Sequence, residues 1–486
     1  MYDEQAECGR LTELLGQLGE HLDQFLLFEH PDAMKDADSW KAALGGALPV
    51  SGIGAEQVIT EMGAYLIPNG SQIPNPGCTS FITTGATSIG VLATLSGAVA
   101  APQRLGLTAF NFLEGLSLQW MAEMFDLPVE MKGVYSSGGS VANLVALGAA
   151  RQWAFEQRGF DPARDGLQAP CRIYASSASH HTIHRSAAVL GMGRNSVTAI
   201  PTDKQGRLNL TALKQQLQAD TSKNSVPVAI VANAGSTDTG AIDPLLEMGK
   251  LAREYKIWFH VDGAYGLPGI LDPQVHSLYD GLSLADSVTV DPHKWLGAPV
   301  GIGATYVRDY GLLRRAFTQE EASYLEGSCA EDDGGKNSMD SLGIPYYDFG
   351  VELSAPSRGA VVWALIKEIG RSGLKDRVCR HNAMARQVAD QVRLHPNLEL
   401  VLEPSLSICC FRFVTDQYGD LNELNRRIHR QLVKNGKNIP STTLFDGILA
   451  IRPCFVGART DWHHASELVD EVIEIGTQLL SKRKTQ

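Results

Sequence analysis

The sequence predicts an α/β protein in which helices cover both faces of a mainly parallel sheet. Between about Asn111 and Tyr310, short apolar runs rich in β-branched residues alternate with stretches of helical periodicity, which is the rhythm of βαβ units. The chain has 486 residues, 44% of them hydrophobic and 20% charged, so it can fill a large core and divide into two or three lobes. After about residue 375 the pattern changes, and a smaller α+β unit is predicted there.

The first predicted element is an amphipathic helix near the N-terminus. Apolar residues recur there at helical spacing, at Leu11, Leu14, Leu15, Leu18, Leu22, Phe25 and Leu26. This stripe has to be buried against the same chain or against a second subunit, and the periodicity leaves both open. The stretch from Cys78 to Gln103 carries no charge, but Thr, Ser and Gly interrupt it. We therefore expect a buried or ligand-facing segment rather than a membrane span.

Six strands are predicted in the α/β region, with helices between most of them. The strands are Gly133–Tyr135, Arg172–Ala175, Val228–Ala232, Ile257–Val261, Ser287–Val290 and Ala304–Val307, and the clearest helices are Val141–Phe155 and Leu245–Tyr255. The stretch from Glu320 to Asn337 is charged and glycine-rich, which is typical of a mobile surface loop. Beyond it the predicted elements are a helix over Ala360–Ile369, strands Ser407–Phe413 and Gly447–Ile451, and helices Leu421–Lys434 and Trp462–Leu480.

Charge and cysteine content argue against several classes of protein. The formal net charge of −12 disfavours nucleic acid or an anionic membrane surface as a partner. The eight cysteines show neither the spacing of a metal site nor that of a disulfide framework, and the N-terminus has no signal-peptide pattern. We therefore expect a soluble protein in the reducing cytoplasm.

Two of the predicted strands end in residues that carry chemistry. Ser287–Val290 is followed by Asp291, Pro292, His293 and Lys294. Pro292 cannot continue a ladder of hydrogen bonds, so Lys294 is expected at the carboxyl end of the strand, where α/β enzymes place their sites. The preceding strand ends in Asp262. A lysine and an acid on two strand ends indicate a carbonyl cofactor that is held as a Schiff base, with the acid against its ring nitrogen.

Two further segments add candidate ligands. Gly139 and Ser140 follow a short strand and open a helix, and the free N–H groups of a helix N-terminus attract an anion. Such a turn is more often only a turn, and its place before the histidine, aspartate and lysine gives it weight. His180 follows the strand Arg172–Ala175, and a flat imidazole can stack on a pyridine ring. His184 lies four residues further on, but no carboxylate or cysteine stands at ligand spacing, so no metal is predicted.

With these residues the chain resembles the pyridoxal-phosphate-dependent (group II) amino-acid decarboxylases related to aromatic-L-amino-acid and glutamate decarboxylases, from about Asn75 to Arg459. The lysine of that family lies in a Pro-His-Lys motif, which is here 292–294. The resemblance implies fold type I with a seven-stranded sheet, pyridoxal 5'-phosphate as cofactor, and a homodimer with its active site at the subunit interface. It divides the chain into an N-terminal segment at the dimer interface (1–105), a large cofactor-binding domain (106–375) and a small C-terminal domain (376–486).

The resemblance also assigns roles to single residues. Lys294 would carry the cofactor, Asp262 would face its ring nitrogen, His180 would stack on the ring and Tyr324 in the predicted loop would donate a proton to Cα. Further cofactor contacts are implied for Gly139, Ser140, Ser236, Ala264, Asp291 and His293. Ser236 stands where the family usually has threonine, which retains a hydroxyl.

The implied reaction is decarboxylation of an L-amino acid, with an aromatic substrate slightly favoured over an acidic one such as glutamate, aspartate or cysteine sulfinate. Trp295 favours an aromatic substrate, whereas Arg104 would favour an acidic one if it faces the pocket, and it could equally be a solvated arginine. Arg358 matches an arginine common in the aromatic branch, so a supporting role is possible for it. Other reactions of the same cofactor stay open, namely those of an aldehyde synthase, an aminotransferase or a carbon–carbon lyase. Tyr324 argues against the aldehyde synthase, and the retained lysine, aspartate and histidine argue against an inactive relative.

Overall fold

The computed structural model describes residues 9–29, 37–83, 85–102, 104, 108–221, 224–318 and 346–484. Its larger sheet has the strand order β2-β8-β7-β6-β5-β3-β4. The strands are β2 (Lys132–Ser136), β3 (Cys171–Ser176), β4 (Val197–Ile200), β5 (Val226–Asn233), β6 (Trp258–Asp262), β7 (Ser287–Val290) and β8 (Gly303–Val307). Only the two pairs that include β8 are antiparallel. The predicted mainly parallel α/β fold with seven strands is confirmed.

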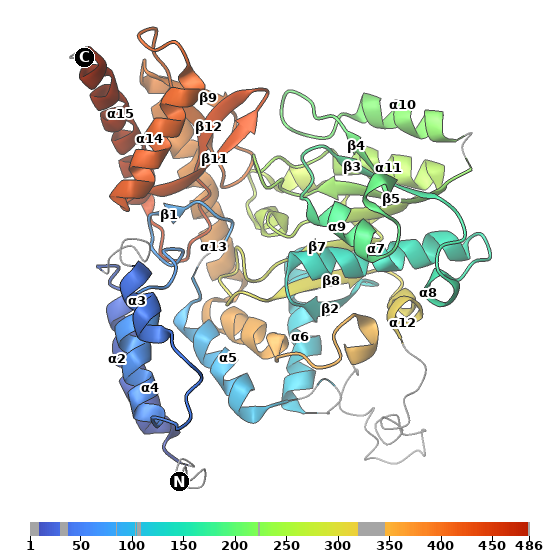
Figure 1. Ribbon diagram of the computed structural model, residues 1–486. Coiled ribbons are helices and arrows are strands. Elements are labelled where there is room, and N and C mark those ends of the chain that lie inside the picture. The colour runs from blue at the N-terminus through green and yellow to red at the C-terminus, as the bar shows by residue number, and fades with distance from the viewer. Residues whose placement is uncertain are drawn as a thin grey trace.

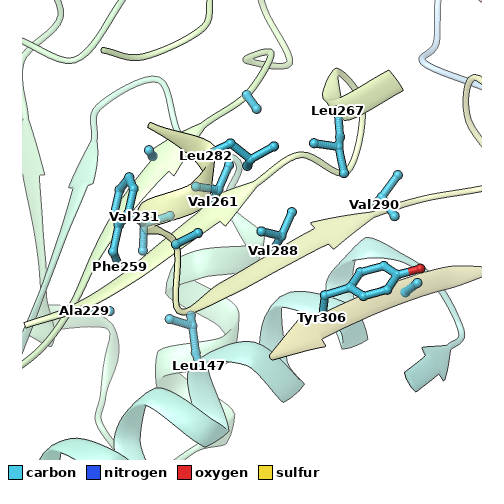
Figure 2. Packing of buried hydrophobic residues seen from close by; sticks show 14 of the residues in the cluster. Leu147, Ala229, Val231, Phe259, Val261, Leu267, Leu282, Val288, Val290 and Tyr306 are labelled. Atoms are coloured by element: carbon cyan, nitrogen blue, oxygen red, sulfur yellow. The ribbon is translucent and has the colours of Figure 1, made fainter. Parts of the chain in front are cut away.

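Apolar side chains cover both faces of this sheet. Helix α7 (Gly139–Glu156) runs along one face, and in Figure 2 its Leu147 lies on the opposite side of the strands from Leu267 and Leu282. Every residue of β6 and β7 is buried, which explains why these strands appear in the sequence as nearly continuous apolar runs. The other helices of this region are α6 (Ala109–Met124), α8 (Pro162–Asp165), α9 (Thr182–Val189), α10 (Leu210–Asp220), α11 (Leu245–Tyr255) and α12 (Gly311–Phe317).

The smaller unit is built on a second sheet with the order β1-β11-β12-β10-β9. Its elements are β9 (Leu398–Leu402), β10 (Cys410–Phe413), α14 (Leu421–Asn435), β11 (Ile439–Phe445), β12 (Ile448–Arg452) and α15 (Trp462–Lys484). It has its own apolar core, in which Phe411, Phe413 and Phe455 are fully buried. The fifth strand, β1 (Cys78–Thr79), comes from the N-terminal part of the chain and pairs in parallel with β11.

A single long helix, α13 (Arg358–Leu394), connects the two units. Its first part contains the predicted helix over 360–369, and Gly370 interrupts it with a φ of 65°, a value that favours glycine. The helix then continues through residue 375, so the domain boundary expected from the sequence falls inside α13 rather than in a linker.

The N-terminal helices lie to one side of the large sheet, at the lower left of Figure 1. They are α2 (Leu11–Phe25), α3 (Ala37–Leu44), α4 (Ala55–Glu61), a π-helix (Met62–Leu66) and α5 (Ser88–Ala100). The predicted amphipathic helix is therefore present, but none of the residues of α2, α3 and α4 is buried within this chain. Burial is not observed for α5 in this chain alone, because it exposes Val91, Leu92 and Val99, and the alternative of a ligand-facing segment stays a prediction.

None of the helices in the described part of the chain combines the length and the apolar character that crossing a bilayer requires.

Trp295, next to the lysine motif, points into the core. It is fully buried, and its ring stacks on Tyr265 with centroids 5.3 Å apart. Its indole N–H donates to Nδ1 of His381 on α13 at 2.9 Å. Trp295 therefore supports the packing of α13 on the large sheet, and the aromatic substrate that it favoured in the sequence stays a prediction.

Burial of His381 predicts a specific dependence of stability on pH. Burial, followed by the nearby Arg380 and Arg377, lowers the pKa of His381 to about 3. As the pH falls below about 6.5, His381 is protonated in the unfolded chain but stays neutral in the folded chain. This contribution to the unfolding free energy is therefore complete above about pH 6.5 and is lost as the pH falls toward 3. In wild-type protein it adds up to about 1.4 kcal/mol per pH unit to the loss of unfolding free energy.

A His381→Gln variant should lack this part of the slope, since glutamine can accept the indole N–H without titrating. Urea denaturation of both proteins at several pH values between 7 and 4 measures the difference. Parallel curves would contradict the prediction.

Candidate active site

A cavity of about 290 Å³ lies at the carboxyl ends of the parallel strands. Because these ends meet at one edge of the sheet, residues that are distant in sequence converge there. Asp262 ends β6, and the turn that carries Lys294 follows β7. The lining residues that the sequence had singled out are Gly139, Ser140, His180, Asp262, Ala264, Asp291, His293 and Lys294.

Lys294 is held by a tight turn after β7. Its backbone N–H donates to the carbonyl of Asp291 at 2.9 Å, which returns the side chain toward the cavity. Its Nζ lies 3.1 Å from Asp291 Oδ2, and the two side chains are 23% and 1% exposed. The buried carboxylate thus pairs with an amine that stays reachable from the cavity.

Asp262 is 7% exposed and accepts hydrogen bonds on both carboxylate oxygens. Oδ1 accepts from the Ala264 N–H at 3.1 Å and from the Thr289 hydroxyl at 3.3 Å. Oδ2 accepts from Nδ2 of Asn143 at 2.9 Å. These hydrogen bonds fix the orientation of the Asp262 carboxylate at this wall of the cavity.

His180 forms another wall. Its Nδ1 lies 3.0 Å from the hydroxyl of Thr182, and its ring contacts that of His181 with centroids 4.1 Å apart. Burial, and next the neighbouring His181, lowers the pKa of His180 below its usual value. The imidazole is therefore neutral at physiological pH and offers a flat, uncharged face.

The glycine turn before α7 has no room for side chains. Gly138 has a φ of +124°, and a Cβ on it would lie 2.9 Å from Cε1 of His293. A Cβ on Gly139 would lie 2.5 Å from Asp291 Oδ2, an oxygen that accepts the Gly139 N–H at 3.0 Å. Among the described residues, the buried Oδ1 of Asp291 has no hydrogen-bond partner. This end of the cavity thus brings together a helix N-terminus, the Ser140 side chain and His293.

Ser236 does not line the cavity, in contrast to the expectation from the sequence. Its hydroxyl contacts the Thr239 hydroxyl at 2.9 Å and accepts the Ala241 N–H at 3.2 Å, so it closes its own turn. The neighbouring Gly235 and Thr237 line the cavity instead. Tyr324 lies outside the described residues.

The two arginines considered for substrate recognition are buried in ion pairs away from the cavity. Arg104 lies 3.1 Å from Glu114, and Arg358 binds Glu352 with its two Nη atoms at 2.7 and 3.0 Å. Arg104 also donates to the Glu352 carbonyl at 3.2 Å, which joins the two pairs. Arg104 is thus neither the pocket arginine nor the solvated arginine that the sequence suggested.

Several lining residues were missed by the sequence reasoning, and Asn143 is the most informative of them. It stands three positions after Ser140 on α7, which places both on one face of the helix, so helical spacing could have identified it. Thr182 and Thr237 were missed because single hydroxyl residues in turns carry no distinctive pattern.

Comparison with known proteins identifies residues 41–414 as a match to the model of the pyridoxal-dependent decarboxylase conserved domain. The chain is 27% identical over 449 residues to an aromatic-L-amino-acid decarboxylase of Bacillus atrophaeus, which covers 90% of each chain. It is 30% identical over 300 residues to an acidic amino acid decarboxylase of Xenopus tropicalis, which covers 60% of this chain and 56% of that protein. A crystal structure of Oryza sativa TDC with PLP and tryptamine superimposes with a TM-score of 0.90 at 22% identity, over 99% of this chain and 100% of that one.

Proposed function

The chain belongs to the pyridoxal-dependent decarboxylase family, and from this premise we propose that it converts an L-amino acid, with an aromatic one favoured, to the amine and carbon dioxide. The observation that carries the proposal is the convergence of the Lys294 amine, the Asp262 carboxylate and the His180 imidazole on one cavity. These are the groups that a pyridoxal-phosphate enzyme needs for covalent attachment, ring charge and ring stacking.

The cavity fits pyridoxal phosphate in its chemistry. Gly139 and Ser140 at the start of α7, together with His293, would hold the phosphate, because a helix N-terminus and a hydroxyl suit an anion and glycine lets the backbone approach it. The unpartnered Oδ1 of Asp291 leaves an acceptor at the same end for a donor brought by a ligand or by water. Lys294 would bind the aldehyde, and Asp262 would face the ring nitrogen.

When bound, the cofactor supplies a protonated pyridine ring that accepts the electron pair left as carbon dioxide departs. Asp262 would keep the ring nitrogen protonated because an opposite charge stabilises the charged form. His180, uncharged, would stack on the ring without competing for that charge. Ala264 would lie against the ring, where a larger side chain would not fit.

The substrate proposal rests on the lining of the cavity. Among the described lining residues, Lys294 is the only lysine and no arginine is present, so no guanidinium is available there to pair with an acidic side chain. Similarity to an aromatic-L-amino-acid decarboxylase over most of both chains also supports an aromatic substrate. A decarboxylase for glutamate, aspartate or cysteine sulfinate is the second candidate, supported by the relative with acidic specificity.

Carbon dioxide release from each of the twenty amino acids and cysteine sulfinate tests the proposal. We expect release from tryptophan, tyrosine, phenylalanine or a hydroxylated derivative to exceed that from the acidic substrates. The reverse order would replace the aromatic assignment by the acidic one. No release from any amino acid would leave an aminotransferase or a carbon–carbon lyase, which keto acid or cleavage products would distinguish. An aldehyde synthase would also release carbon dioxide, and its aldehyde product in place of the amine would identify it.

Tyr324→Phe should change the product rather than the fold. If the Tyr324 hydroxyl donates the proton to Cα, carbon dioxide is still lost but protonation is delayed, and oxygen can react before the amine forms. Amine formation should fall by ~10²–10⁴-fold, as expected on removal of a general acid, while aldehyde, ammonia and peroxide increase in air. Amine and aldehyde are quantified together under air and under nitrogen. An unchanged amine yield and rate would assign the proton to another donor.

We also propose that the protein is a homodimer whose interface is formed by the N-terminal helices and the segments between them. Apolar residues are exposed in this chain at Leu48, Val50 and Ile53 between α3 and α4, and at Val91 and Leu92 on α5. Several large apolar side chains exposed in one region of the chain are typical of a protein interface.

Light scattering should give a particle of twice the 52.5 kDa subunit. Val50→Glu should weaken the dimer, whereas Val129→Glu, at an equally exposed valine before β2, should leave it intact. A fully active wild-type monomer would contradict the proposal.

A further inference from the structure

Asn143 lies at the centre of a hydrogen-bond network that reaches the cavity from inside the α/β core. Its side chain is 1% exposed, and both ends of its amide make hydrogen bonds. Nδ2 donates to Asp262 Oδ2 at 2.9 Å and to the Thr182 hydroxyl oxygen at 3.3 Å. Oδ1 accepts from His260 Nε2 at 2.9 Å, and it lies 3.3 Å from the Thr289 hydroxyl oxygen, whose single proton has Asp262 Oδ1 at the same distance as an alternative acceptor.

The hydrogen bonds behind Asn143 run in one direction only. They begin at Trp258, whose indole N–H can only donate, and they end at Asp262, whose ionised carboxylate can only accept. Trp258 Nε1 donates to Ser287 Oγ at 2.8 Å, and the Ser287 hydroxyl donates to His260 Nδ1 at 2.9 Å. His260 Nε2 then donates to Asn143 Oδ1, which turns Nδ2 toward Asp262. The two ends therefore fix the amide orientation of Asn143 and the tautomer of His260.

The surroundings of His260 agree with this tautomer. The side chain is fully buried, and burial lowers its pKa to about 4, so the imidazole is neutral with its proton on Nε2. A neutral ring can accept from Ser287 and donate to Asn143 at the same time, whereas a charged ring could only donate.

We propose that Asn143 is a positioning residue that holds the Asp262 carboxylate directed into the cavity, and that His260 fixes the Asn143 amide in the orientation this requires. This rests on the proposed function, in which Asp262 faces the ring nitrogen. The second N–H of Asn143 reaches Thr182, whose hydroxyl contacts His180 Nδ1. The Asn143 amide therefore connects Asp262, which would face the nitrogen of the cofactor ring, with His180, which would stack on the ring. Loss of this amide should affect both side chains.

Asn143→Leu tests the proposal, because leucine is nearly isosteric with asparagine and makes none of its side-chain hydrogen bonds. The apoprotein of this variant should bind pyridoxal phosphate about 10- to 100-fold more weakly, the range expected when a hydrogen bond to a charged group is lost. This is measured by absorbance titration with the cofactor. In the loaded enzyme kcat should fall by a similar factor and KM should change little, because the charge on Asp262 matters most in the transition state.

Two histidine variants and a control separate positioning from general stability. His260→Gln keeps a donor for Asn143 Oδ1 and should retain most of the cofactor affinity, whereas His260→Leu should behave like Asn143→Leu. Tyr174→Phe is the matched control, since it removes one buried hydrogen bond to a carboxylate, that of Asp220 at 3.2 Å, on the same sheet. It should lower the melting temperature but leave both cofactor affinity and kcat unchanged.

Wild-type affinity and kcat in a folded Asn143→Leu protein would overturn the proposal, and so would equal losses in Tyr174→Phe. Equal losses of cofactor affinity in His260→Gln and His260→Leu would show that His260 does not orient the Asn143 amide. Failure of the proposed function would look different: the wild-type protein would bind no pyridoxal phosphate, or Asp262→Ala would match it in kcat.

Discussion

Replacement of Lys294 by alanine should abolish the borohydride-reducible bond between the protein and its cofactor. Lys294 has the only lysine amine among the described residues that line the cavity, so no other described group there can bind the cofactor aldehyde covalently. Turnover should fall by roughly 10³-fold or more, since loss of a covalent nucleophile costs up to about 10⁶-fold in kcat. Reduction with borohydride followed by mass spectrometry of the peptide that contains residue 294 measures the bond, and carbon dioxide release measures turnover.

The ion pair with Asp291 supplies the control for this experiment. In Lys294→Ala the carboxylate of Asp291, which is 1% exposed, loses its cation, and an unpaired buried charge is destabilising. Lys294→Arg retains a cation near Asp291 but cannot form the covalent bond. We expect both variants to lack the reducible bond and only the alanine variant to lose thermal stability. Full turnover by the arginine variant would show that the covalent attachment lies elsewhere.

Asp262→Ala should retain some cofactor and lose most of its activity. A charge partner within about 4–6 Å shifts a pKa by roughly 1–3 units, so without Asp262 the protonated fraction of the ring nitrogen falls about 10- to 1,000-fold. kcat should fall within that range, and the absorbance spectrum of the bound cofactor should shift as the ring loses its proton. The spectrum and kcat are measured on the same sample.

Asp272→Asn is the matched control for Asp262→Ala. Asp272 is also buried, and it accepts from Nδ2 of Asn382 at 2.9 Å, but it does not line the cavity. Its replacement should lower stability without changing the spectrum or kcat. A wild-type kcat in Asp262→Ala would show that the ring is not activated through this carboxylate.

Local patterns predicted the large sheet well because its strands are buried on both faces. Ser287–Val290 and Leu245–Tyr255 were predicted with their observed bounds, since an uninterrupted apolar run and a strong helical period leave little ambiguity. The short edge strand β4 and the partly buried β9 were missed, because half-exposed strands carry a weaker signal. In the smaller unit, β10 begins only at Cys410, three residues after the predicted start.

The sequence predicted which residues belong to the site better than it predicted which way their side chains point. A motif at a strand end places Lys294 and Asp262 at the right edge of the sheet, because parallel strands share that edge. It does not say which way a neighbouring side chain points, and for this reason Ser236 was expected to contact the cofactor although its hydroxyl closes its own turn. Arg104 was misjudged because its partner, Glu114, lies on a helix that packs beside it only in the folded chain.

The pairing of β1 with β11 can form during synthesis only after β11 has left the ribosome. The Ser80 hydroxyl next to β1 donates to the Ile439 carbonyl of β11, 359 positions later in the chain. At a ribosomal rate of about 5–20 residues per second, roughly 20–70 seconds separate the emergence of these two segments. During that interval the apolar N-terminal helices have no strand to anchor them, so nascent chains are exposed to association at this end. Chains that terminate before residue 439 lack this pairing, so they should expose their N-terminal segment to chaperones in addition to the incomplete smaller unit.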